Sequence, residues 1–223
     1  MNNPDNLIHP SSPKILPASD PAWREPCFAT LDRAGLVAVP TETVYGIIAR
    51  ADLPEAVERL YRVKGRDENK PCALFVADWK TLCPQYVPEN PLASMLVEAF
   101  WPGPLTIVVN AHEHCPAIAN GKVGARSPSH PLIQELLAHY TGPLINTSLN
   151  RSGEPPAQAL QEAQEVLEQL DLAIDGGNLP PAAPSTVVDC TQPKPVVWRE
   201  EEITPMQIEE VCKEIHLSPV SPE

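Results

Sequence analysis

Groups that could bind a small anion are concentrated in one short part of the chain. The segment VPTETVYG at 39–46 predicts a buried strand that opens into a polar loop at 41–43. The cations Lys64, Arg66 and Lys70 follow at the end of a predicted helix. Hydroxyls, backbone amides and cations within one span are the groups that hold a carboxylate or a phosphate.

Cations and polar side chains also stand near other predicted strands. Arg126 follows a short strand and precedes a helix, and its planar guanidinium could hold a carboxylate through two parallel hydrogen bonds. Asn146, Ser148 and Asn150 follow the predicted strand 144–145, and open α/β sheets usually bind ligands in crevices at strand ends. Taken alone, each group also fits a solvated charge or a capping turn. The remaining candidate cations are Lys122, Arg151 and Arg199.

Several common catalytic patterns are absent from the sequence. It contains neither GxxxxGK[ST] nor GxGxxG, and Ser148 is not part of a GxSxG elbow. The run His-Glu-His-Cys at 112–115 favours a solvated loop over a metal site, because no second ligand pair follows at a suitable spacing. A reaction that depends on positioning two substrates and neutralising phosphate charge fits these residues better than covalent catalysis.

The composition indicates a globular protein with one core. With 223 residues, of which 43% are hydrophobic, length favours a single domain. The formal charge of −13 disfavours general nucleic-acid binding across the surface. Six cysteines without a CxxC pair indicate reduced thiols. Because the sequence has neither a signal-peptide pattern nor an apolar run of roughly 18 residues, we expect a cytoplasmic protein with no membrane association.

The order of the predicted elements indicates an α/β fold. We expect one domain over 20–216, between a flexible N-terminal arm at 1–19 and a C-terminal tail at 217–223. Several connections are too short for repeated right-handed crossovers, which favours a twisted mixed parallel/antiparallel sheet with flanking helices. The predicted strands are 36–39, 72–76, 105–109, 144–145, 185–189 and an edge strand at 195–198, and the predicted helices are 21–34, 54–63, 90–100, 131–141, 157–170 and 204–215.

Six motifs occur in order along the chain. They are PTETVYG at 40–46, KxR at 64–66 with KP at 70–71, WPGPLT at 101–106, RxPxHP at 126–131, SxN with SGEP at 148–155, and STVVD at 185–189. In this order and spacing they resemble the YrdC-like family of threonylcarbamoyl-AMP synthases, over about residues 20–200. The resemblance implies the YrdC-like fold in its short, single-domain form.

The same resemblance implies a nucleotidyltransferase that joins L-threonine, bicarbonate or CO2, and ATP into threonylcarbamoyl-AMP and pyrophosphate. The product would supply threonylcarbamoyladenosine in transfer RNA, and transfer RNA or its modification proteins are further candidate partners. Mg2+ is expected with ATP, with no protein side chain as its ligand. The resemblance implies threonine contacts for Thr43, Arg126 and Asn146, and ATP contacts for Lys64, Arg66, Lys70, Lys122, Ser148, Asn150 and Arg199. It singles out no catalytic acid or base.

Departures from the family pattern leave two other interpretations open. Asn146, Leu149 and Arg151 replace the residues that are usual in the family. One alternative is a diverged relative that binds a nucleotide or RNA without synthase activity. Another is an enzyme that forms a carbamoyl-adenylate on a different amine. Neither the acceptor amino acid nor the oligomeric state follows from the sequence.

Overall fold

Ten strands pair into one mixed sheet in the computed structural model, which describes residues 13–67 and 72–213. They are β1 (Lys14–Pro17), β2 (Val37–Val39), β3 (Gly46–Arg50), β4 (Ala73–Phe75), β5 (Leu105–Asn110), β6 (Lys122–Arg126), β7 (Leu144–Ser148), β8 (Leu172–Asp175), β9 (Thr186–Asp189) and β10 (Val196–Arg199). Their order across the sheet is β1-β8-β2-β3-β7-β4-β6-β5-β9-β10. The pairs β1–β8, β2–β8, β4–β6 and β5–β9 are parallel, and the other neighbours are antiparallel. The mixed α/β fold is therefore confirmed.

Most of the longer helices begin at a proline, which suits the first helical position because its missing N–H needs no partner there. Prolines open α2 (Pro54–Lys64), α4 (Pro91–Phe100), α5 (Pro131–His139) and α7 (Pro205–Lys213). The remaining helical segments are η1 (Pro21–Trp23), α1 (Arg24–Leu31), α3 (Trp79–Leu82), η2 (Leu160–Ala163) and α6 (Gln164–Leu167). The predicted capping role of Asp20 is confirmed, since its carboxylate accepts a hydrogen bond from the Ala22 N–H at 2.9 Å.

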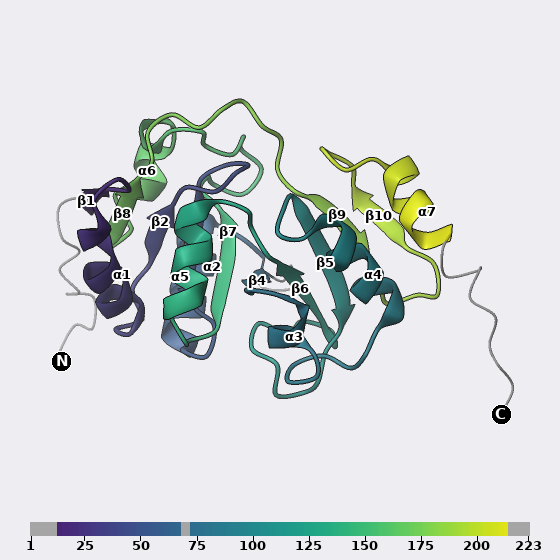
Figure 1. The fold of residues 1–223 in the computed structure, drawn as a ribbon. Helices are drawn as coiled ribbons and strands as arrows, with labels where there is room; N and C mark the ends of the chain where they lie inside the picture. Colours follow the sequence, from purple (N-terminus) through teal and green to yellow (C-terminus); the bar gives the residue numbers. More distant parts are fainter. Residues whose placement is uncertain (1–12, 68–71, 214–223) are drawn as a thin grey trace, which may run out of the picture.

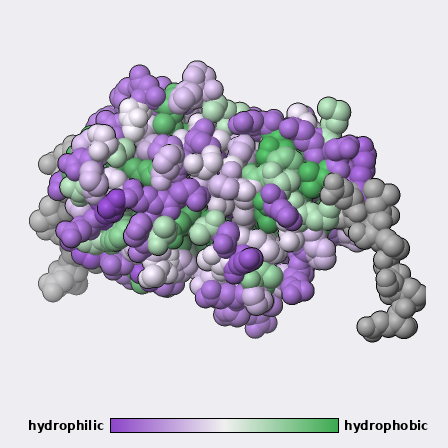
Figure 2. Space-filling view, in the orientation of Figure 1, coloured by the Kyte–Doolittle hydropathy of each residue, from purple (hydrophilic) through white to green (hydrophobic). Residues whose placement is uncertain are grey.

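Two apolar clusters cover different parts of the sheet. Helices α1 and α5 pack on one face, against β2, β3, β8 and the beginning of β7. The larger cluster lies on the other face and includes residues of α2, α4 and α7. Figure 1 shows β1 and β10 at opposite ends of the sheet, and the chain between β8 and β9 passing from one half to the other. In Figure 2 hydrophilic residues cover much of the visible face, and hydrophobic residues gather over the half that contains α4 and β9.

Several predicted elements need correction. Four residues of the predicted flexible arm form β1, which pairs with β8 from Lys14↔Leu172 to Pro17↔Asp175. Strands β3 and β8 and the short helix α3 were not predicted. The predicted helix 157–170 is instead the two short segments η2 and α6. The predicted arm up to residue 12, Lys70, the last residues of the predicted helix 204–215 and the tail at 217–223 lie outside the described residues.

The described part of the chain also bears on the cysteines, metals and membranes. All six cysteines are free. Among residues 13–67 and 72–213, no three His, Cys, Asp or Glu side chains come together in a way that could hold a metal ion. The rings of His112 and His114 stack on each other, with centroids 5.6 Å apart. Within the same ranges, no helix has the length and apolar character needed to cross a bilayer.

Candidate functional site

A cavity of about 630 Å³ lies over the middle of the sheet, on the face whose other part is covered by α1 and α5. Strand β7 passes from the covered to the uncovered part of this face. Leu144 packs under the helices, whereas Asn146 and Ser148, which follow on the same face, line the cavity. Strand β6 contributes Lys122, Gly124 and Arg126 in the same alternation. The site is thus an uncovered part of a sheet face. This differs from the crevice at the strand ends that the sequence predicts.

The charge of the cavity is opposite to that of the whole chain. Among the described residues, its lining includes the four cations Arg66, Lys122, Arg126 and Arg199 and no carboxylate side chain. The chain as a whole has 29 acidic residues against 16 Lys and Arg. Four cations in one hollow favour an anionic ligand, because the surrounding protein weakens solvent screening, although Lys122 and Arg126 also form ion pairs with Asp189 and Glu42.

The loop between β2 and β3 is held in place by its own hydrogen bonds. The Thr41 Oγ1 accepts hydrogen bonds from the N–H groups of Thr43 and Val44, both at 3.2 Å, and donates to the Val44 carbonyl at 2.6 Å. Tyr45, which follows, donates to the Gly177 carbonyl at 2.8 Å. The predicted ligand residue Thr43 is fully buried at the cavity wall. The loop therefore presents its side chains on a fixed backbone.

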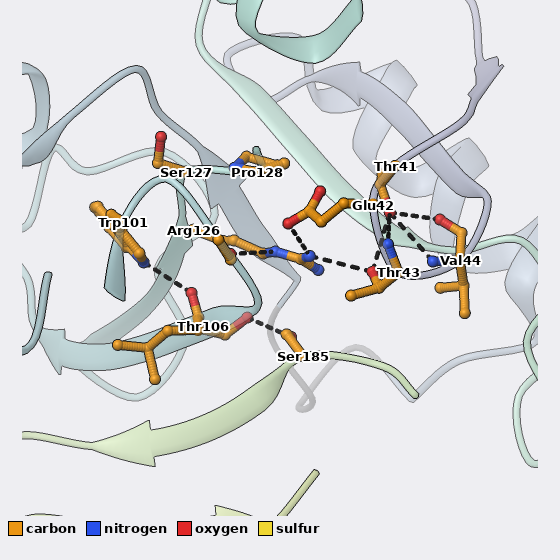
Figure 3. A network of polar contacts seen from close by, with 12 residues as sticks. Thr41, Glu42, Thr43, Val44, Trp101, Thr106, Arg126, Ser127, Pro128 and Ser185 are labelled. Carbon is orange, nitrogen blue, oxygen red and sulfur yellow. Dashed lines mark hydrogen bonds and ion pairs between the residues drawn. The ribbon is translucent and has the colours of Figure 1, made fainter. Parts of the chain in front are cut away.

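Arg126 extends from the end of β6 toward this loop (Figure 3). One of its terminal nitrogens, Nη2, lies 2.6 Å from the Glu42 Oε1 and donates to the Thr43 Oγ1 at 3.1 Å. The Nε donates to the Gly103 carbonyl at 3.2 Å. The Arg126 side chain is only 7% exposed. The guanidinium is thus fixed at the cavity wall, and a carboxylate of the protein already contacts it.

Lys64 belongs to a second polar cluster, which lies behind the cavity wall. Its ammonium donates to the Ser148 carbonyl at 2.6 Å and to the Ser148 Oγ at 3.0 Å, and it also contacts the Asn150 Oδ1. Lys64 is 3% exposed, and burial, assisted by the positive charge of Arg66, lowers its pKa to about 8. Gly65 ends α2 with φ at +60°, a conformation that favours glycine, so the chain can turn toward Arg66.

The opposite wall is formed by β9, β10 and the segment before β9. Arg199 donates to the Ser185 carbonyl at 2.9 and 2.7 Å, and the Ser185 hydroxyl lies 2.7 Å from the Thr106 Oγ1. Burial lowers the pKa of Arg199, and the charges of Arg126 and Arg66 act in the same direction, while Glu201 opposes them. These three guanidinium groups therefore share one region of the molecule.

At the same wall, Trp198 lines the cavity and is 55% exposed. The Lys122 Nζ lies 5.6 Å from the centroid of its ring and forms an ion pair of 3.1 Å with Asp189. Burial would raise the pKa of Asp189, but hydrogen bonds from Thr191 and Lys122 outweigh it and hold that pKa below its usual value. Lys122 is thus held between a carboxylate and an aromatic face.

The structure gathers most of the predicted ligand residues, with differences in their placement. Asn146 and Ser148 lie within β7, opposite Ile48 and Gly46, whereas we had predicted a loop after the strand. Lys64 and Asn150 support Ser148 and do not line the cavity. Lys70 is not described. Those that line the cavity are Thr43, Arg66, Lys122, Arg126, Asn146, Ser148 and Arg199.

The residues that sequence reasoning did not assign to the site include Glu42, Ser185 and Trp198, although the first two lie within the motifs PTETVYG and STVVD. Glu42 is the partner of Arg126, Ser185 is the partner of Arg199, and Trp198 forms part of the wall. The signal for Trp198 was an aromatic residue in a predicted edge strand next to Arg199. No local pattern predicts the other two contacts, because each joins segments that are far apart in the sequence.

Comparison with known proteins identifies the family. The model of the family Sua5/YciO/YrdC, described as "Telomere recombination", matches residues 29–201. The chain belongs to the Sua5/YciO/YrdC family. It is 36% identical over 204 residues to a threonylcarbamoyl-AMP synthase of Pyrococcus abyssi, and the match covers 88% of this chain and 59% of that protein. The chain thus spans about three fifths of the length of this curated relative.

Solved structures of the Sua5/YciO/YrdC family have the same fold. The P. abyssi Sua5 complexed with L-threonine superposes with a TM-score of 0.78 at 32% identity, and the match covers 89% of this chain and 60% of that chain. The E. coli YciO superposes with a TM-score of 0.76 at 26% identity, covering 86% of this chain and 96% of that one. The fold predicted from the resemblance is confirmed.

Proposed function

We propose that this chain is an L-threonylcarbamoyl-AMP synthase. The observation that carries the proposal is the gathering of four cations, with hydroxyl and amide side chains, in one cavity of an otherwise acidic protein. The relative named threonylcarbamoyl-AMP synthase and the Sua5 structure that contains L-threonine support it. The substrates would be L-threonine, bicarbonate or CO2, and ATP, and the product would serve the modification of transfer RNA.

In the proposed reaction, the amine of threonine first combines with bicarbonate to give a carbamate and water. A carbamate oxygen then forms a bond to the α-phosphorus of ATP, and the bond from that phosphorus to the bridging oxygen breaks, so that pyrophosphate leaves with the electron pair. The protein supplies mainly position and charge for such a phosphorus-centred displacement. This agrees with a site that holds several fixed cations and, among the described residues, no carboxylate in the cavity lining.

The residues divide between the two substrates by their chemistry. Arg126 and Thr43 would hold the threonine end, Arg126 through the carboxylate, and Asn146 lies on the same wall. The cations Arg66, Lys122 and Arg199 would contact the nucleotide and its phosphates, together with Ser148. Lys64 and Asn150 would act by fixing the Ser148 side chain.

Mg2+ is part of the proposal as the ion that accompanies ATP. Such an ion commonly keeps several waters and binds substrate phosphates with few protein ligands. Among the described residues the cavity lining has no carboxylate side chain, which agrees with an ion held mainly by phosphates and water. When bound, it would neutralise phosphate charge. Location in the cytoplasm is also proposed, and six free thiols agree with a reducing compartment.

The test is an assay of pyrophosphate release with ATP, bicarbonate and each amino acid in turn. We expect release that depends on L-threonine, with threonylcarbamoyl-AMP identified by mass spectrometry. Release with a different amino acid would reassign the acceptor. Binding of ATP without turnover for any amino acid would reject the synthase and favour a nucleotide-binding relative.

A further inference from the structure

The Glu42 carboxylate already contacts one terminal nitrogen of the Arg126 guanidinium. Its Oε1 lies 2.6 Å from the Arg126 Nη2, the same nitrogen that donates to Thr43 (Figure 3). The two side chains are 7% and 19% exposed. A bound amino acid whose carboxylate is to meet this face of the guanidinium must therefore compete with Glu42.

The contact between Glu42 and Arg126 leaves one carboxylate oxygen unsatisfied. The Glu42 Oε2 is buried and has no hydrogen-bond partner. A buried polar atom without a partner weakens the state in which it occurs. A free ligand carboxylate is not tethered to the loop, so it can use both oxygens in two parallel hydrogen bonds to the fork. The exchange of one carboxylate for the other is therefore favourable for the ligand.

The surroundings of Glu42 oppose its departure in the absence of a ligand. Glu42 also borders a second, open cavity of about 810 Å³, and the loop backbone is held by hydrogen bonds that do not involve the Glu42 side chain, so a Glu42 that leaves Arg126 would turn into this cavity. That cavity is lined by residues 181–183 and by Glu200, Glu201 and Glu202. Like charges there make the turned-out position of Glu42 unfavourable. The ion pair thus persists until another carboxylate replaces it.

We propose that Glu42 acts as a competitor, built into the chain, for the carboxylate site on Arg126, and so sets how tightly a ligand carboxylate binds there. A ligand with a carboxylate offers Arg126 a new partner and releases Glu42 toward the acidic cavity. An amine of similar shape that lacks a carboxylate leaves the ion pair closed and gains nothing from Arg126. Glu42 thereby lowers the affinity for amino acids and leaves the affinity for simple amines unchanged. This inference rests on the proposed function, because it assumes that Arg126 is the carboxylate site.

The test is the affinity for L-threonine, measured by isothermal titration calorimetry on the whole chain. Glu42→Gln keeps the shape but removes the charge, so we expect the Kd for L-threonine to fall about tenfold, equivalent to about 1.4 kcal/mol. The Kd for ATP should change by less than about twofold, and L-threoninol, which lacks the carboxylate, should bind no more tightly than to the original chain. Glu202→Gln is the matched control, since Glu202 borders the same acidic cavity without contacting Arg126, and the Kd for L-threonine should change by less than about twofold.

A Kd for L-threonine that is unchanged or higher in Glu42→Gln would overturn the proposal and make Glu42 a residue that positions Arg126 for the ligand. If Glu42→Gln does not fold, Glu42→Asp replaces it, because the shorter side chain weakens the ion pair and should also lower the Kd. Absence of L-threonine binding to every variant would overturn the proposal too. If the synthase assay fails but Glu42→Gln binds L-threonine more tightly, the proposed synthase function is rejected while the role of Glu42 as a competitor stands.

Discussion

Arg126 and Lys64 are both buried cations of the same site, yet their surroundings differ. Arg126 contacts the Glu42 carboxylate, whereas Lys64 is surrounded by the neutral oxygens of Ser148 and Asn150. The pKa of Lys64 falls to about 8 through burial. A cation with a carboxylate partner can exchange it for a ligand carboxylate. A cation enclosed by neutral oxygens fixes those oxygens in place. Residue type alone therefore does not separate a ligand-binding cation from a supporting one.

The largest expected effect comes from removing the exchangeable cation. Arg126→Ala should raise the KM for L-threonine far more than the KM for ATP, because a charged hydrogen bond contributes about 1.5–3 kcal/mol, or roughly 10- to 150-fold. Steady-state kinetics with each substrate varied in turn measures this. Arg126→Lys keeps the charge but loses the planar fork, so its KM for L-threonine should lie between those of the original chain and Arg126→Ala. Equal changes in both KM values would remove the distinction between the two ends of the cavity.

The buried charge of Lys64 should make the unfolding free energy depend on pH. In the unfolded chain Lys64 titrates near 10.5, and in the folded protein near 8, so the cost of burying its charge disappears as the pH rises through this window. Across the window from about pH 8 to 10.5, the unfolding free energy of the original chain should therefore increase by about 2–3 kcal/mol relative to that of Lys64→Met, since each pH unit is worth at most about 1.4 kcal/mol. Urea unfolding of both proteins at several pH values provides the measurement. A difference that stays constant or decreases would show that Lys64 is not held in a desolvating environment.

A smaller effect is expected at the nucleotide end. Trp198→Ala should raise the KM for ATP about fivefold, since stacking of a base on an exposed aromatic ring is worth about 1 kcal/mol. Val196→Ala is the matched control, because Val196 is exposed on the same strand but does not line the cavity. The KM for L-threonine should stay unchanged in both variants. Equal values for the two variants would exclude Trp198 from the ATP site.

Local sequence patterns predicted the parts of the fold that depend on local physics. Proline starts, the Asp20 cap and the apolar period of α2 all give helices near their predicted positions. The pairing of β1 with β8 could not be predicted, because it joins Lys14 to Leu172 across most of the chain. Strands β3 and β8 follow β2 and α6 closely along the chain, so their apolar residues were not recognised as separate elements.

The candidate site was predicted in its residue types more than in its arrangement. The motifs identified Arg126 and Ser148, and the family resemblance also implied Arg199; all three line the cavity. The alternation of Lys122, Gly124 and Arg126 on one face of β6 could have indicated an uncovered sheet face. The contact between Glu42 and Arg126 joins residues 84 positions apart, and the burial of Lys64 depends on β7, so both required the folded structure.

The most direct test of the account is a crystal structure of the protein with L-threonine and a non-hydrolysable ATP analogue. We predict that the threonine carboxylate lies within hydrogen-bond distance of the Arg126 guanidinium, with Glu42 turned toward the acidic cavity and the phosphates among Arg66, Ser148 and Arg199. A threonine carboxylate bound away from Arg126, or phosphates outside this cavity, would contradict the account.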